Sequence, residues 1–215
     1  MSAAVVMRRI AEASPRFKAR MAGVLFLLLV VTAAFTEFFA RGRLSSAADL
    51  AAGIIEVSCM IAVTLLFYGI FKPVNRRLSL LAASFNFLAL ALELLQFLPR
   101  GVNIGLGFHG LYWILIGYLI FRSTFMPRIL GPLMAIAGLC WLTFLVPPLA
   151  SHVSPYNLAS ALLVEALVML WLLVMGVNVQ RWKEQASAGG RVGTTSTRLV
   201  NAAGSTGRCN TIPIC

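Results

Sequence analysis

Four carboxylates stand within otherwise apolar stretches of this 215-residue chain. They are Glu37, Glu56, Glu93 and Glu165, and His109 is the one histidine in such a stretch. Carboxylates and imidazoles can hold cations or exchange protons with a ligand. A charge at the centre of a membrane helix costs about 2.5–3.5 kcal/mol or more, so such residues usually have a function. These five groups are therefore the candidate functional residues.

The composition sets the surroundings of these groups. Hydrophobic residues make up 60% of the chain, charged residues make up 12%, and the mean hydropathy is +0.88. Soluble domains contain only about 45–50% apolar residues. The composition excludes soluble, fibrous and disordered proteins and predicts a polytopic membrane protein.

Six stretches reach the length of about 20 apolar residues that a membrane helix needs. The predicted spans are 21–40, 50–71, 78–98, 104–121, 129–146 and 158–179. None shows the two-residue alternation of a barrel wall. We therefore expect an all-α fold, a bundle of six transmembrane helices with short loops and antiparallel neighbours.

The basic residues predict the orientation of this bundle. With six spans, 15 of the 18 Lys and Arg residues fall on the side of the two termini. The positive-inside rule then places both termini in the cytoplasm. The clusters of Lys and Arg at the cytoplasmic ends of the spans should contact anionic lipid headgroups. We expect no nucleic-acid partner, because no basic patch interleaved with aromatic residues lies outside the spans.

The predicted domains are a basic cytoplasmic segment at 1–20, the transmembrane domain at 21–184 and a tail at 185–215. The tail is rich in Gly, Ser, Thr, Ala and Asn, so we expect it to be disordered. The four cysteines have no metal-binding spacing. Residues 105–110 match G-x-G-x-x-G, but no strand precedes them, so no nucleotide cofactor is expected. Gly110, Gly117, Gly131 and Ala135 instead predict close helix packing.

The five ionisable groups should lie on five helices in one layer of the outer half, at depths of about 4–10 Å given the rise of 1.5 Å per residue. We expect Glu56, Glu93, His109 and Glu165 to line one cavity that is open to the outer face. Asn86, Glu93 and Gln96 share a helical face and should add polar groups to it. The pair Glu37 and Arg41 should lie at the rim of this cavity.

Several short sequences resemble a family of bacterial multi-pass membrane proteins known only as a domain of unknown function. They are RMAG at 20–23, EFF at 37–39, FKPVNR at 71–76, GYLIFRS at 117–123 and PRILG at 127–131. The resemblance covers roughly residues 16–185, and the stretch at 117–131 is its most specific part. It implies a location in the bacterial plasma membrane and no known activity.

Three functions are consistent with these features. The first is binding or transport of a small solute, ion or lipid at the polar layer. A structural or accessory subunit is the alternative, because polar residues also hold membrane helices together. A membrane enzyme that uses a Glu/His pair as acid and base is less favoured, because the sequence has no catalytic motif. The ligand, the metal and the oligomeric state stay open.

Overall fold

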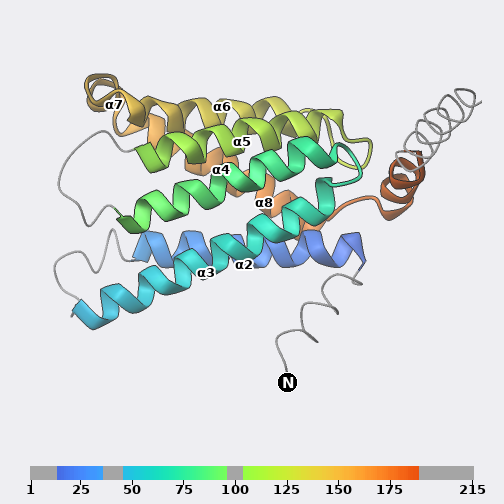
Figure 1. Ribbon diagram of the computed structural model, residues 1–215, viewed down its shortest axis with the longest axis horizontal. Helices are drawn as coiled ribbons and strands as arrows, with labels where there is room; N and C mark the ends of the chain where they lie inside the picture. The colour runs from blue at the N-terminus through green and yellow to red at the C-terminus, as the bar shows by residue number, and fades with distance from the viewer. Residues whose placement is uncertain (1–13, 36–45, 96–103, 189–215) are drawn as a thin grey trace, which may run out of the picture.

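The fold is known from a computed structural model that describes residues 14–35, 46–95 and 104–188 (Figure 1). Every regular element in these ranges is helical, which confirms the predicted all-α class. The elements are α2 (Pro15–Phe35), α3 (Ser46–Phe71), α4 (Arg76–Leu95), α5 (Ile104–Arg122), α6 (Leu130–Leu142), η2 (Thr143–Leu145), α7 (Pro147–Val153) and α8 (Tyr156–Val174). A further helical stretch covers 179–188.

The turns between these helices follow from their residues. Asn75 begins α4, because its Oδ1 accepts from the backbone N–H groups of Arg77 and Leu78, both at 3.1 Å, as an N-cap does. Gly176 has a φ of 66°, which ends the last long helix in the left-handed conformation that glycine tolerates. Asn178 then caps the stretch 179–188 by accepting from Arg181 N at 3.2 Å.

The six long helices form a closed ring in chain order. Helix α2 packs against α3 and α8, α4 packs against α3 and α5, and α6 packs against α5 and α8. Successive helices of the ring run antiparallel (Figure 1). The interior of the ring is therefore shared by all six, and a side chain that points inward can meet residues from several helices.

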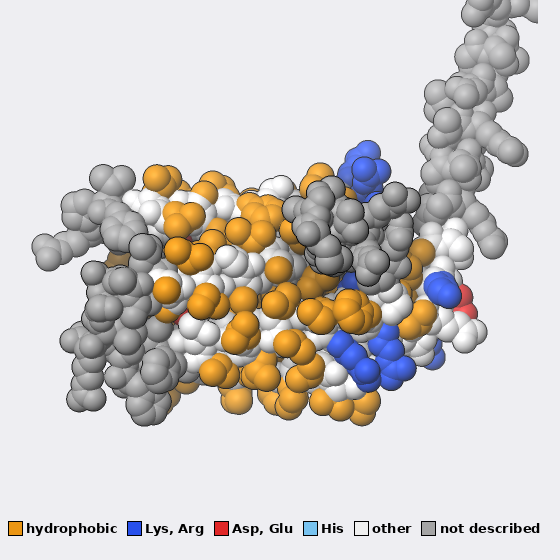
Figure 2. Space-filling model, turned by 90° about the horizontal axis from the view of Figure 1, so that it is seen from below, with side chains coloured by type: hydrophobic (Ala, Val, Ile, Leu, Met, Phe, Trp, Pro, Cys, Tyr) orange, Lys and Arg blue, Asp and Glu red, His pale blue; other side chains and the backbone are white. Residues whose placement is uncertain are grey.

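Trp113 fills the interior of this ring. It is fully buried, and its ring packs edge-on against Phe26 of α2, with centroids 5.9 Å apart, and against Phe67 of α3, with centroids 6.3 Å apart. Large aliphatic side chains such as Leu119 share the interior, whereas many others point outward, such as Leu163, which is 62% exposed. Figure 2 shows hydrophobic side chains over the length of the bundle and Lys and Arg gathered at one end. A hydrophobic surface along the bundle is what contact with lipid tails requires.

The helices match most of the predicted spans. Within the described residues, four helices are long and apolar enough to cross a membrane, namely 51–71, 76–95, 104–122 and 156–174, and a shorter apolar helix covers 130–145. The last predicted span extends to 179, whereas α8 ends at Val174, because Gly176 turns the chain there. Residues 185–188 of the expected tail continue the final helix, and residues 189–215 and 1–13 lie outside the described residues.

Candidate functional site

A chain of hydrogen bonds crosses the interior from α5 to α3. Trp113 Nε1 donates to His109 Nε2 at 2.9 Å, and His109 Nδ1 lies 3.0 Å from Asn86 Oδ1 on α4. Asn86 Nδ2 donates to Thr64 Oγ1 on α3 at 2.6 Å, and the Thr64 hydroxyl donates to the carbonyl of Met60 at 2.7 Å. The structure thus brings together Asn86 and His109, two residues that the sequence singled out.

The direction of these bonds fixes the state of His109. An indole N–H can only donate, so Nε2 of His109 must accept and carries no proton. The ring proton then lies on Nδ1 and is donated to Asn86 Oδ1, which leaves the Asn86 amide free to donate to Thr64. His109 is therefore a neutral imidazole with both nitrogens in hydrogen bonds. The hydrogen bond from His109 to Asn86 joins α5 to α4.

Glu165 lies beside this chain, on α8. Its side chain is only 2% exposed, and its Oε1 accepts a hydrogen bond from Trp141 Nε1 on α6. The Trp141 ring packs edge-on against the His109 ring, with centroids 5.3 Å apart and planes at 88°. Trp141 therefore connects the predicted residues His109 and Glu165 without any direct hydrogen bond between them.

Tyr112 lies against the same group of rings. Its ring centroid is 4.8 Å from that of Trp113 and 6.2 Å from that of His109. Its hydroxyl is buried and has no hydrogen-bond partner among the described residues. The side chain of Thr64 approaches this hydroxyl without reaching good hydrogen-bond geometry, and Glu165 interacts with it electrostatically.

Glu56 on α3 and Glu93 on α4 form a separate pair. Both side chains are partly buried, and their carboxyl groups interact electrostatically. In the described ranges, no three His, Cys, Asp or Glu side chains come together to hold a metal ion. Gln96 and the expected rim residues Glu37 and Arg41 lie outside the described residues.

Sequence reasoning missed four interior residues, Thr64, Tyr112, Trp113 and Trp141. A signal for two of them was available. Tryptophan in membrane proteins concentrates near the interfaces, whereas Trp113 and Trp141 lie well inside their predicted spans. Trp113 also follows His109 by four residues, which places the two on one helical face. Thr64 and Tyr112 carry no such signal, because their role depends on the neighbouring helices.

Glycines bring α5 and α6 close together, as the sequence predicts. A Cβ at Gly117 would lie 2.6 Å from the Gly131 carbonyl oxygen and 2.8 Å from the Ala135 nitrogen. A Cβ at Gly110 would lie 2.7 Å from the carbonyl oxygen of Gly138. These glycines form a seam, which we define as Gly110, Gly117, Gly131 and Gly138. The seam holds His109 on α5 opposite Trp141 on α6.

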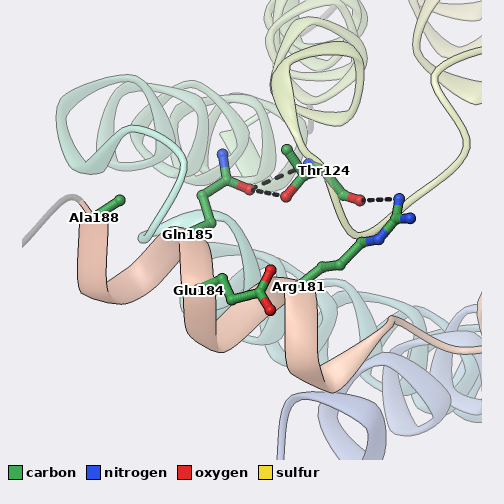
Figure 3. A pocket seen from close by; sticks show the side chains of 5 residues that line it. All are labelled: Thr124, Arg181, Glu184, Gln185 and Ala188. Atoms are coloured by element: carbon green, nitrogen blue, oxygen red, sulfur yellow. Dashed lines mark hydrogen bonds between the residues drawn. The ribbon is translucent and has the colours of Figure 1, made fainter.

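A second polar network lies at the opposite end of α5. The stretch 179–188 is tied to the loop after α5, because Gln185 Oε1 accepts from both the N–H and the hydroxyl of Thr124, at 3.2 and 3.1 Å. Arg181 Nη1 donates to the Thr124 carbonyl at 3.4 Å. Figure 3 shows these residues with Glu184 and Ala188 around a shallow, open hollow. Trp182 also donates to the carbonyl of Ile70, at 2.8 Å, so the loop after α5 and the end of α3 are both joined to the stretch 179–188.

Comparison with known proteins identifies one similar family. Its model matches residues 89–176, and the family is described as a domain of unknown function (DUF4386). No curated protein and no solved structure matches the chain. The match confirms the resemblance for the sequences at 117–123 and 127–131, whereas those at 20–23, 37–39 and 71–76 lie outside it. The part of the chain that carries His109, Trp141 and Glu165 therefore matches a family of unknown function.

Proposed function

We propose that this chain binds or transports a small cation or cationic solute at carboxyl groups in the outer half of its bundle. The observation that carries the proposal is the pair Glu56 and Glu93. Their side chains come from adjacent helices, are partly buried and interact electrostatically. Two like charges in a medium of low polarity repel, and a bound cation removes that repulsion. Of the residues that the sequence singles out, Glu165, Asn86 and His109 also face the interior, and we include Gln96 in the proposed site.

The proposal includes the topology. We propose six spans in a bacterial plasma membrane, with both termini in the cytoplasm and Glu37 and Arg41 at the outer rim. The basic side chains gathered at one end of the bundle (Figure 2) support this orientation, because positive residues favour the cytoplasmic side. At this end, burial and then the neighbouring charge of Lys72 lower the pKa of Lys18. An anionic lipid headgroup would relieve this repulsion.

The test measures stabilisation by defined cations. The purified protein in detergent would be unfolded thermally in Na⁺, K⁺, Mg²⁺, Ca²⁺ or choline. A ligand present at 100 times its Kd stabilises by about 2.7 kcal/mol. We expect one of these cations to raise Tm, and Glu56→Gln and Glu93→Gln to remove that increase.

Glu184→Gln is the matched control, because Glu184 is exposed in the stretch 179–188. It should keep the full response of the unaltered protein. A response that survives in Glu56→Gln and Glu93→Gln, or no response to any of the five cations, would contradict the cation site.

A structural or accessory subunit is the second candidate. It is favoured by the chain from Trp113 to Thr64, in which each polar group is paired and neutral. Such a chain holds helices together and offers no free group to a ligand. If this candidate is correct, Glu56→Gln and Glu93→Gln should change neither cation response nor Tm, whereas changes in the chain should lower Tm.

A further inference from the structure

We propose that Glu165 and Tyr112 form a proton-binding site in the interior of the bundle. In this site the Glu165 carboxyl carries a proton, and one water molecule joins it to the Tyr112 hydroxyl. The site is distinct from the pair Glu56 and Glu93, and it stands whether or not that pair binds a cation.

The first step is that, in the part of the chain that the structure describes, no Lys or Arg faces the Glu165 carboxyl. Helices α2, α6 and α7 pack against α8. The described cations of α2 are Arg16, Lys18 and Arg20, which lie in its first two turns. Helix α6 has no Lys or Arg and only Cys140 as a titratable group, and His152 of α7 is exposed.

Across the interior, α5 presents two titratable groups to Glu165, namely Tyr112 and His109. His109 is neutral, since its Nε2 accepts from Trp113. An ionised carboxylate at this place would therefore be a buried charge without a counter-charge. Burying such a charge costs so much that a carboxyl group in this position takes up a proton instead.

The second step assigns the two carboxyl oxygens. Trp141 Nε1 donates to Oε1, so Oε1 acts as an acceptor, which suits the carbonyl oxygen of a carboxylic acid. The proton then belongs to Oε2, which becomes a donor. The acid thus needs one further acceptor on its second oxygen, and Trp141 cannot supply it.

The third step is the Tyr112 hydroxyl. It is buried, has no partner among the described residues and interacts electrostatically with Glu165. A buried polar group without a partner costs about 1–3 kcal/mol, and such groups are generally paired with protein or ordered water. Glu165 makes no hydrogen bond to this hydroxyl, so a bridging molecule would complete the pairing of both groups.

A water molecule has the donors and acceptors that this bridge needs. A buried water makes about three hydrogen bonds. Here it can accept from Glu165 Oε2, bond to the Tyr112 hydroxyl and donate to Thr64 Oγ1. The Thr64 oxygen has two lone pairs, and Asn86 Nδ2 uses one of them. The water would therefore join the neutral chain of α3, α4 and α5 to the acid on α8.

The experiment is infrared spectroscopy of the full chain in lipid nanodiscs at neutral pH. The C=O stretching band of a protonated carboxyl is separate from the bands of carboxylates. We expect the difference between the unaltered protein and Glu165→Gln to show the loss of one such band. Glu184→Gln, on the exposed final helix, should not remove it. A spectrum in which Glu165→Gln loses only carboxylate bands would overturn the proposal.

Tyr112→Phe removes only the hydroxyl and keeps the ring, so it serves even if Glu165→Gln does not fold. We expect it to shift the frequency of the Glu165 band, because the bridge to the acid is lost. In the unaltered protein, exchange into heavy-oxygen water should shift one O–H band of a bound water, and Tyr112→Phe should abolish that shift. An unchanged carboxyl band and an unchanged water band in Tyr112→Phe would refute the bridge.

Discussion

The interior network and the network at the end of α5 use similar hydrogen bonds in opposite surroundings. In the interior, Asn86 and Thr64 are 0% and 1% exposed. At the end of the bundle, Thr124 and Arg181 are exposed. Both networks join segments that are far apart in the sequence. They differ in whether water can replace a lost hydrogen-bond partner. Solvent reaches the end of the bundle, whereas Asn86 and Thr64 in the interior of the ring are closed to it.

This difference sets the cost of breaking each network. A buried donor or acceptor that loses its partner costs about 1–3 kcal/mol, whereas the net contribution of an ordinary hydrogen bond is about 0.5–1.5 kcal/mol. A close-packed interior also has no space for added atoms. The interior should therefore respond strongly to small changes and the exposed end weakly, and this contrast can be tested region by region.

The largest effect should come from the glycine seam. Gly117→Leu places a Cβ 2.6 Å from the Gly131 carbonyl oxygen and adds three further carbons. Since the obstacle is backbone, α5 and α6 must separate. We expect a loss of about 3 kcal/mol or more in the free energy of unfolding, at the upper end of overpacking effects. Thermal unfolding in detergent would measure it.

Gly53→Leu is the matched control for the seam. Gly53 also lies within a helix, but among the described residues no atom outside its own helix backbone lies within 4 Å of a Cβ placed there. The substitution should leave Tm unchanged or raise it, because glycine weakens a helix interior. Equal losses in the two variants would show that the seam is not a close contact.

The second largest effect should come from Asn86. Asn86→Leu keeps the approximate size of the side chain but leaves the buried Nδ1–H of His109 without an acceptor. It also removes the donor to Thr64 Oγ1, whose hydroxyl still donates to the carbonyl of Met60. We expect a loss of about 1–3 kcal/mol. Nitrogen NMR of the imidazole should show a shifted Nδ1 resonance, because this N–H loses its acceptor, whereas the Trp113 N–H still keeps Nε2 unprotonated.

Ser84→Ala is the control on the same helix, since the Ser84 hydroxyl is exposed and bonds only to Leu80 O of its own helix. It should leave both stability and the Nδ1 resonance of His109 as they are. A stable Asn86→Leu protein with an unchanged His109 spectrum would mean that the chain does not form.

Trp182 is intermediate in burial between the two networks, and its contribution to the free energy of unfolding should be intermediate too. Its side chain is partly buried, and Trp182→Phe removes the N–H that donates to Ile70 O at 2.8 Å. We expect a loss of about 1 kcal/mol. Trp171→Phe makes the same change at a partly buried tryptophan whose indole N–H has no hydrogen bond in the described structure. A smaller loss for Trp182→Phe than for Trp171→Phe would contradict the role of the Ile70 bond.

The helices were predictable from the sequence because each span is a local property. Runs of about 20 apolar residues bounded by Pro73, Pro127 and Pro147 specify helices whatever their neighbours. The seam was also predictable, since Gly110 and Gly117 are seven residues apart and so share a face. The early end of α8 was missed, because Gly176 and Asn178 stand in a sequence that remains apolar.

The candidate site was predictable only in its residue types. The sequence singles out Asn86, His109 and Glu165, because polar groups are costly in lipid wherever they point. The sequence does not indicate which residues are the hydrogen-bond partners of these polar groups. Tyr112 carries no signal in the sequence, and Trp141 carries only its position inside a predicted span. The roles of both depend on the order of helices around the ring. That order is a property of the whole bundle.

The smallest effect should come from Gln185, which completes the contrast. Its Oε1 accepts from Thr124 at 3.2 and 3.1 Å, and its Nε2 donates to the carbonyl of Arg122 at 3.4 Å. Water can replace each of these bonds, so Gln185→Ala should change the global free energy of unfolding by no more than about 0.5 kcal/mol. Local opening is more sensitive, and the amides of 179–188 should exchange with solvent about two- to fivefold faster. Gln180→Ala, at an exposed glutamine of the same helix, should not alter this exchange. A global loss as large as that of Asn86→Leu would mean that burial does not separate the two networks.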